Sequence, residues 1–65
     1  MTVEEIRVKA EERAKNATNE ALVEMFFKSA TAYQSKLEGN CSNDALDKAL
    51  ERVFVYRSEL LKRLG

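Results

Sequence analysis

Apolar residues between positions 46 and 64 recur every three or four places, which is the spacing of one face of an α-helix. At about 100° per residue, most of them fall within about one third of the helix circumference. These are Leu46, Leu50, Val53, Phe54, Leu60, Leu61 and Leu64. The pattern predicts a helix over about 43–64 that buries one face. Ser42 or Asn43 has the side chain expected of its N-cap.

The apolar positions before residue 38 also have helical spacing, but they form two stripes that lie more than a quarter of a turn apart. Thr2 and Glu5 have the spacing of a capping box at the start of a helix. Gly39 stands where a helix end commonly takes a left-handed conformation. We therefore predict a first helix over about 3–37 and a turn over 38–42. The early stripe is Val3, Ile6, Ala10, Ala14, Ala17 and Ala21, and the later one is Leu22, Phe26, Ala30, Tyr33 and Leu37.

The change of stripe leaves two arrangements open. Either the first helix breaks near Asn16–Asn19, where Thr18 or Asn19 is able to cap a new helix, or it continues and shows different faces to different neighbours. A continuous helix would be about 50 Å long and the second about 33 Å, so the first dozen residues would have no partner in a hairpin. They either fold back as a third helix or pack on another subunit, and we favour the second arrangement. The predicted fold class is all-α: an antiparallel helical hairpin that assembles into a four-helix-type bundle as a homo-oligomer, with a dimer favoured.

The length of the chain supports self-association. With 65 residues it forms a single helical domain over 1–65, and a domain of this size buries too little surface to be very stable alone. One cysteine, Cys41, makes no intramolecular disulfide, and the absence of histidine removes the usual partners of cysteine in structural zinc sites. A net charge of zero and 45% hydrophobic residues indicate a folded chain and argue against a general polyanion binder.

The residue types for common catalysis are missing. Without histidine, Ser-His-Asp and Cys-His nucleophilic arrangements are impossible, and no glycine-rich phosphate loop occurs. We expect no enzymatic activity, no cofactor and no metal. The N-terminal residues do not resemble a signal peptide, and no apolar run approaches the roughly 20 residues that span a bilayer. An unpaired cysteine fits a reducing compartment, so we expect a soluble cytoplasmic protein with no membrane contact.

Both predicted helices are apolar on more than one side near the middle of the hairpin, which is typical of a hairpin with a second face to cover. This pattern predicts a non-catalytic protein–protein interaction module, a self-associating small regulator, adaptor or subunit. Binding of a different protein is the alternative partner. The predicted interface residues are Met25, Phe26, Phe27, Phe54, Val55 and Leu61.

Arg57 falls in the centre of the apolar stripe of the second helix. Its long stem allows the charge to reach water, which is one interpretation. The other is an ion pair across the hairpin, since Glu24 lies about opposite when the turn is centred near residue 40. A Glu24–Arg57 pair would fix the helix register or the oligomeric state, as buried polar groups do in some bundles.

The C-terminal segment interleaves an aromatic residue with bases, a composition that also occurs in nucleic-acid-binding proteins. In size and plan, and in the short run Tyr56-Arg57-Ser58 with Leu60, the chain resembles the Rop family of plasmid copy-number proteins. That resemblance covers a small fraction of the chain and includes no motif of the first helix. It implies a two-helix hairpin that dimerises and binds RNA. The alternative function is therefore a Rop-like RNA- or DNA-binding regulator with contacts from Lys28, Arg57, Lys62 and Arg63.

Overall fold

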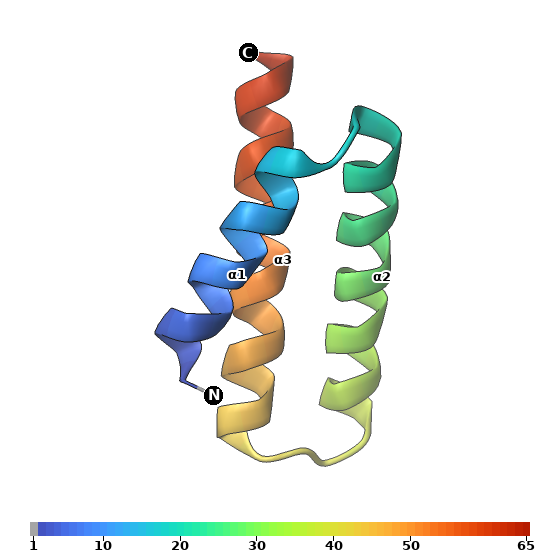
Figure 1. The fold of residues 1–65 in the computed structure, drawn as a ribbon. Helices are drawn as coiled ribbons and strands as arrows, with labels where there is room; N and C mark the ends of the chain where they lie inside the picture. Colours follow the sequence, from blue (N-terminus) through green and yellow to red (C-terminus); the bar gives the residue numbers. More distant parts are fainter. Residues whose placement is uncertain (1) are drawn as a thin grey trace.

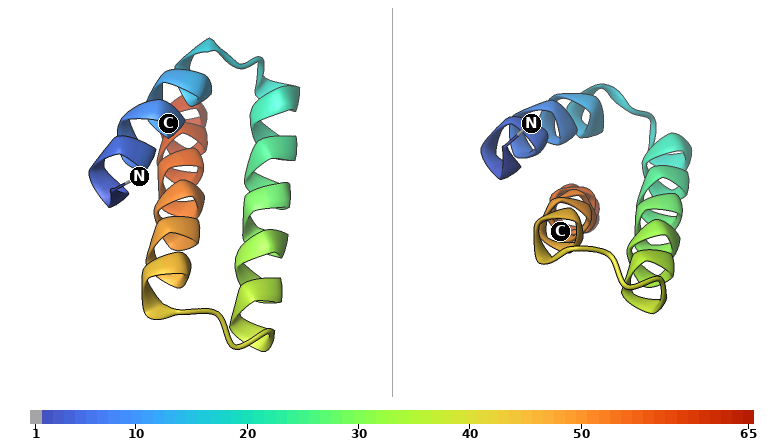
Figure 2. Two further views of the ribbon diagram at one scale, coloured as in Figure 1. Left: turned by 60° about the horizontal axis from the view of Figure 1, so that its bottom comes forward. Right: turned by 90° about the horizontal axis from the view of Figure 1, so that it is seen from below.

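A computed structural model describes residues 2–65, which form three α-helices (Figure 1). They are α1 (Val3–Asn16), α2 (Asn19–Glu38) and α3 (Asn43–Leu64). α2 and α3 lie side by side and run in opposite directions, and α1 crosses α3 obliquely (Figures 1 and 2). α3 packs against both other helices, whereas α1 and α2 hardly touch. The all-α prediction is confirmed, but the predicted two-helix hairpin is wrong because the chain forms three helices.

The predicted helix over 3–37 is interrupted by two extended residues. Ala17 has φ −83° and ψ 146°, and Thr18 has φ −68° and ψ 165°. The Thr18 hydroxyl accepts a hydrogen bond of 3.2 Å from the backbone N–H of Ala21 and so caps α2. Of the two arrangements that the sequence allows, the break within 16–19 is the one observed.

α1 folds back onto α3 within the same chain, so the preference for a contact with another subunit is also wrong. The buried residues of α1 are Ile6, Ala10 and Ala14. Because alanine side chains are small, the two helices approach closely but bury little apolar area. Polar contacts in the first half and at the end of α1 add to this packing.

Arg7 and Arg63 make these polar contacts. The Arg7 Nε donates a hydrogen bond to the Glu51 carboxylate of α3, and this bond raises the pKa of the Arg7 guanidinium. At the other end, Arg63 donates to the Ala14 carbonyl at 2.9 Å and to Asn19 Oδ1 at 2.8 Å. Arg63 thereby links the end of α1, the start of α2 and the last turn of α3.

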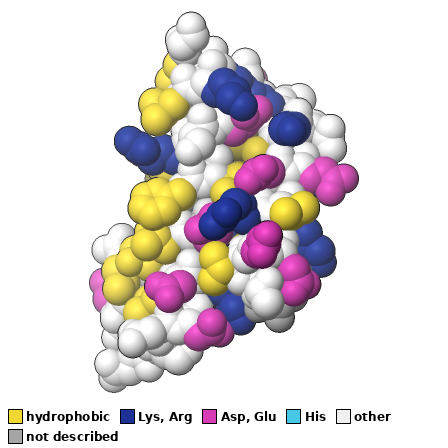
Figure 3. Space-filling view, turned by 90° about the vertical axis from the view of Figure 1, so that its left-hand side faces the viewer, with side chains coloured by type: hydrophobic (Ala, Val, Ile, Leu, Met, Phe, Trp, Pro, Cys, Tyr) yellow, Lys and Arg dark blue, Asp and Glu magenta, His cyan; other side chains and the backbone are white. Residues whose placement is uncertain are grey.

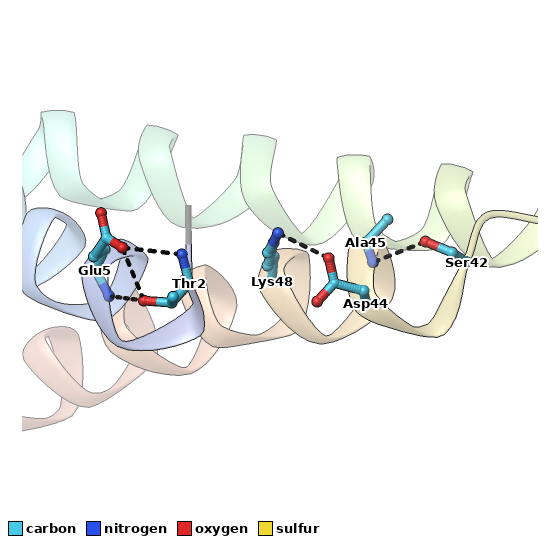
Figure 4. Close-up of polar contacts among 6 residues, drawn as sticks. All are labelled: Thr2, Glu5, Ser42, Asp44, Ala45 and Lys48. Carbon is cyan, nitrogen blue, oxygen red and sulfur yellow. Dashed lines mark hydrogen bonds and ion pairs between the residues drawn. The ribbon is translucent and has the colours of Figure 1, made fainter.

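The predicted capping box of the first helix is confirmed (Figure 4). The backbone N–H of Glu5 donates to the Thr2 hydroxyl at 3.2 Å, and the backbone N–H of Thr2 donates to the Glu5 carboxylate at 3.3 Å. These hydrogen bonds favour the ionised carboxylate and lower the pKa of Glu5. At the start of α3, Ser42 accepts a hydrogen bond from the N–H of Ala45, so Ser42 is the N-cap.

The turn between α2 and α3 differs in one detail from the expectation. Gly39 ends α2 with φ −93°, and its N–H donates to the Ser35 carbonyl at 3.1 Å. The left-handed residue is the next one, Asn40, with φ 58°. Asparagine adopts this conformation more readily than most residues. Gly39 was therefore the wrong residue for the left-handed position, although the helix does end there.

The hydrophobic core is small. It consists of Ala10, Ala14, Leu22 and Tyr56, and within residues 2–65 only Leu22 is a large side chain with no exposure. On α3 the buried residues are Ala49 and Tyr56. The predicted buried stripe of this helix was centred too far round, since Phe54 and Leu61 at one edge of it stay exposed. The apolar surface that the core does not use is the main feature of the molecule.

Candidate interaction surface

The pair formed by α2 and α3 has two long sides, and α1 covers only one of them (Figure 2). Large apolar side chains remain at the surface of this small protein. Besides Val8 on α1, they are Val23, Phe27, Leu37, Phe54, Leu61 and Leu64 of α2 and α3. Their positions on the two helices decide whether they are scattered or form one surface.

On α3, Phe54 and Leu61 are one heptad apart and each is 51% exposed. At about 100° per residue they lie about 140–160° round the helix from buried Tyr56. Leu50 lies between these residues and the contact with α2, and it is half-buried. The apolar stripe of α3 therefore points away from the core, and Phe54 on its outer side also borders the groove between α1 and α3.

On α2, Val23 and Phe27 are 54% and 71% exposed. They lie about 100–140° round the helix from buried Leu22. Half-buried Ala30 and exposed Leu37 continue the stripe towards the turn. This stripe also points away from the core.

Both stripes lie on the same side of the molecule. Seen from the start of α3, positions advance clockwise along α3 and anticlockwise along the antiparallel α2. On α3 the outer stripe lies clockwise from the side that faces α2. On α2 the outer stripe lies anticlockwise from the side that faces α3. Both rotations end opposite α1. We name this surface the open face; its apolar residues are Val23, Phe27, Ala30 and Leu37 of α2 and Leu50, Phe54, Leu61 and Leu64 of α3.

The distribution of side chains at the surface and the total exposed area are both in keeping with a hairpin that has one uncovered side. Figure 3, which looks onto the side where α1 lies, shows hydrophobic side chains in a band along one edge and charged groups scattered over the rest. The protein exposes 4782 Å². A folded monomer of 7.4 kDa typically exposes about 4200 Å². The excess is consistent with a hairpin that is covered on one side only.

The spacing along the open face is regular. On α2 the positions 23, 27, 30, 34 and 37 alternate steps of four and three, and on α3 the positions 43, 47, 50, 54, 57, 61 and 64 do the same. This heptad spacing is the pattern by which helices of different chains pack side by side. It is present in the sequence, and it is the signal by which sequence reasoning could have separated the outer stripe from the core.

Half of the predicted interface residues lie on the open face. Phe27, Phe54 and Leu61 are exposed there. Met25, Phe26 and Val55 are half-buried and pack against the core of the same chain. The structure thus divides the predicted interface into residues that stabilise the monomer and residues that remain available.

The predicted Glu24–Arg57 pair is not formed within the chain, and both residues are exposed. Glu24 follows Leu22 by two positions, so it lies about 160° round α2 from the core side. Arg57 lies on the open face, between Phe54 and Leu61 in the outer stripe of α3. The sequence had placed Arg57 in the centre of a stripe predicted to be buried, whereas the residue is exposed.

The predicted nucleic-acid contacts do not come together. Lys62 lies beside α1, about 140° round α3 from Arg57, and Arg63 is bonded to Ala14 and Asn19. Lys28 is exposed on α2, away from the open face. No basic patch results from these residues.

A groove of about 290 Å³ lies between α1 and α3. Its lining includes Phe54 and Val55, and its charged residues are equal numbers of bases and acids, namely Arg7, Lys15 and Lys62 with Glu11, Glu51 and Glu59. This lining does not favour a ligand of either charge. Within residues 2–65, side chains of cysteine, aspartate and glutamate form no group of three that is able to hold a metal ion. None of the three described helices has the length and apolarity needed to cross a membrane.

Comparison with known proteins gives no family for this chain. No protein-family model, no curated protein and no solved structure matches it. The resemblance to the Rop family therefore rests on the short run near Tyr56, and the two-helix plan that it implied differs from the observed three helices. Functional conclusions depend on the open face alone.

Proposed function

We propose that the protein is a non-catalytic interaction module that self-associates through the open face. The observation that carries this proposal is the set of exposed large apolar residues on the uncovered side of α2 and α3. Soluble monomers rarely keep large contiguous apolar patches exposed, and such patches are typical of protein–protein interfaces. The protein would act as a small regulator, adaptor or subunit in its self-associated form.

Two features favour a second copy as the occupant. The chain has no net charge, so two copies do not repel each other strongly. The open face has heptad spacing on both helices, which suits packing against like helices. A stable interface needs about 800 Å² per partner, which is roughly one sixth of the surface of this protein. A symmetric dimer would use the same face on both copies.

An exposed free thiol in the turn, that of Cys41, is compatible with a reducing compartment. We therefore also propose the cytoplasm as the location. The dimer would form there without disulfide bonds.

The test compares two substitutions of exposed apolar residues. Phe27→Glu introduces a charge on the open face, and Val8→Glu does the same on α1, outside that face. Because both residues are exposed in the single chain, both variants should fold with wild-type helicity. We expect Phe27→Glu to be monomeric by sedimentation equilibrium at concentrations where wild type and Val8→Glu are dimeric.

A folded Phe27→Glu variant that associates as wild type does would contradict the proposal. So would a wild-type protein that stays monomeric at high micromolar concentration. A wild-type protein that binds RNA with a steep dependence on salt, and remains monomeric, would support the nucleic-acid function instead.

A further inference from the structure

Two residues of opposite charge interrupt the outer stripe of α3. Asp47 and Arg57 are both exposed, and neither forms an ion pair or side-chain hydrogen bond with another of residues 2–65. They occupy two of the heptad positions, with Leu50 and Phe54 between them. Position 52 is midway between the two charges and also midway between Leu50 and Phe54. When two copies of this stripe lie antiparallel with their positions 52 aligned, Asp47 of each copy therefore faces Arg57 of the other.

The outer stripe of α2 has a matching centre. Position 52 lies nine residues after Asn43, where α3 begins. α2 ends at Glu38, and position 29 lies nine residues before that end. Position 29 is next to the midpoint between Phe27 and Ala30. Antiparallel helices have the same rise of about 1.5 Å per residue, so these two centres lie at the same level of the hairpin. On α2 the residues on either side of this centre are Phe27, which is large and 71% exposed, and the small Ala30.

We propose that two copies pack open face to open face about a two-fold axis that crosses both helices at this level. This arrangement rests on the proposed self-association. α3 then lies antiparallel to α3 of the partner subunit, with Asp47 opposite Arg57 of the partner subunit. Leu50 faces Phe54 of the partner subunit, and Phe27 packs on Ala30 of the partner subunit. Each contact occurs twice because the axis is two-fold.

The charges decide between this register and its alternatives. A parallel pairing of the α3 stripes sets Arg57 against Arg57 of the partner subunit and Asp47 against Asp47, with like charges in contact. A shift of one heptad in either direction sets Asp47 against a leucine of the partner subunit and removes its pairing with an arginine. Charged residues at such positions commonly fix the register and orientation of packed helices at some cost in affinity. Asp47 and Arg57 would have this function.

Charge reversal tests the pairing without changing the apolar residues. In Arg57→Asp and in Asp47→Arg, each symmetric contact brings like charges together, so each variant alone should dimerise at least about tenfold more weakly than wild type. Mixing the two single variants pairs opposite charges at both contacts, and the double variant does so as well. We expect the equimolar mixture to form a one-to-one heterodimer and the double variant to recover most of the wild-type affinity.

The control is Lys28→Asp, a charge reversal on α2 away from the open face, which should leave the dimer unchanged. If wild type dimerises but Arg57→Asp dimerises equally well, or if the mixture does not associate, the register is wrong and the proposed function stands. If wild type and the equimolar mixture both remain monomeric, the proposed function itself fails. Heterodimer formation is read from native mass spectrometry, because the variants differ in mass.

Discussion

The two long sides of the α2–α3 pair differ in the size of their apolar residues. The side under α1 is closed mainly by small residues, Ala10 and Ala14, with a polar link from Arg63. The open face carries Phe27 and Phe54 at heptad positions. α1 is joined to α2 by two residues, so its docking loses little translational freedom and needs little buried area. A separate chain must overcome the full entropy of association, and large side chains supply the area that this requires.

The largest expected difference concerns two leucines of the same helix. Leu22 has no exposure and Leu37 is 51% exposed. In the monomeric Phe27→Glu background, Leu22→Ala should lower the free energy of unfolding by about 2–5 kcal/mol because it leaves a cavity. Leu37→Ala should lower it by less than about 0.5 kcal/mol. Urea unfolding followed by circular dichroism measures both. Equal effects would mean that the covered and open sides do not differ as described.

The next prediction concerns the close approach of α1. Ala14 is 1% exposed against α3, so Ala14→Leu should force α1 outward and lower the free energy of unfolding by about 1–3 kcal/mol. Ala32→Leu, at an exposed position of α2, should change it by less than about 0.5 kcal/mol. A stable Ala14→Leu protein with wild-type helix content would show that small residues are not required under α1.

Arg63 provides a smaller effect on the same side. Replacing it with methionine removes the hydrogen bonds to the Ala14 carbonyl and to Asn19, which should cost about 1–2 kcal/mol. Amide hydrogen exchange should become faster throughout α1, since the end of that helix is held by this side chain. Lys62→Met is the control, because it removes a positive charge next to Arg63 but no hydrogen bond to α1. Similar exchange in both variants would argue against a role of Arg63 in holding α1.

The smallest effect comes from pH. The capping hydrogen bonds lower the pKa of Glu5 in the folded protein. Its stabilising contribution is therefore present above the unfolded pKa and is lost as the pH falls through the folded value. Acid titration of α1 amide exchange in wild type and in Glu5→Gln should show this loss in wild type only. Glu12→Gln, outside the capping box on the same helix, should keep the wild-type profile.

Local signals in the sequence predicted the local structure well. The caps at Thr2 and Ser42 follow from side chains that satisfy free backbone groups, and the helix end near Gly39 follows from the weak helix propensity of glycine. The left-handed residue was misplaced by one position because asparagine and glycine are adjacent there and both adopt this conformation.

Tertiary contacts were harder to predict. Apolar periodicity indicated that the first helix changes its face near residue 17, but not whether α1 docks on its own chain. That choice depends on the short connection and on Arg63, and neither the tether nor a long-range hydrogen bond leaves a periodic pattern. The burial of Tyr56 follows from where α1 docks, so it could not be predicted either. The open face was foreseen as a second apolar side, but with core residues such as Phe26 among its members.

The central claim is that the open face binds a second copy of the chain. Sedimentation equilibrium of the wild-type protein over a dilution series tests it most directly. We expect a mass of twice 7.4 kDa at high micromolar concentration, which falls towards the single-chain mass on dilution while the helicity changes little. A single-chain mass at every concentration would contradict it.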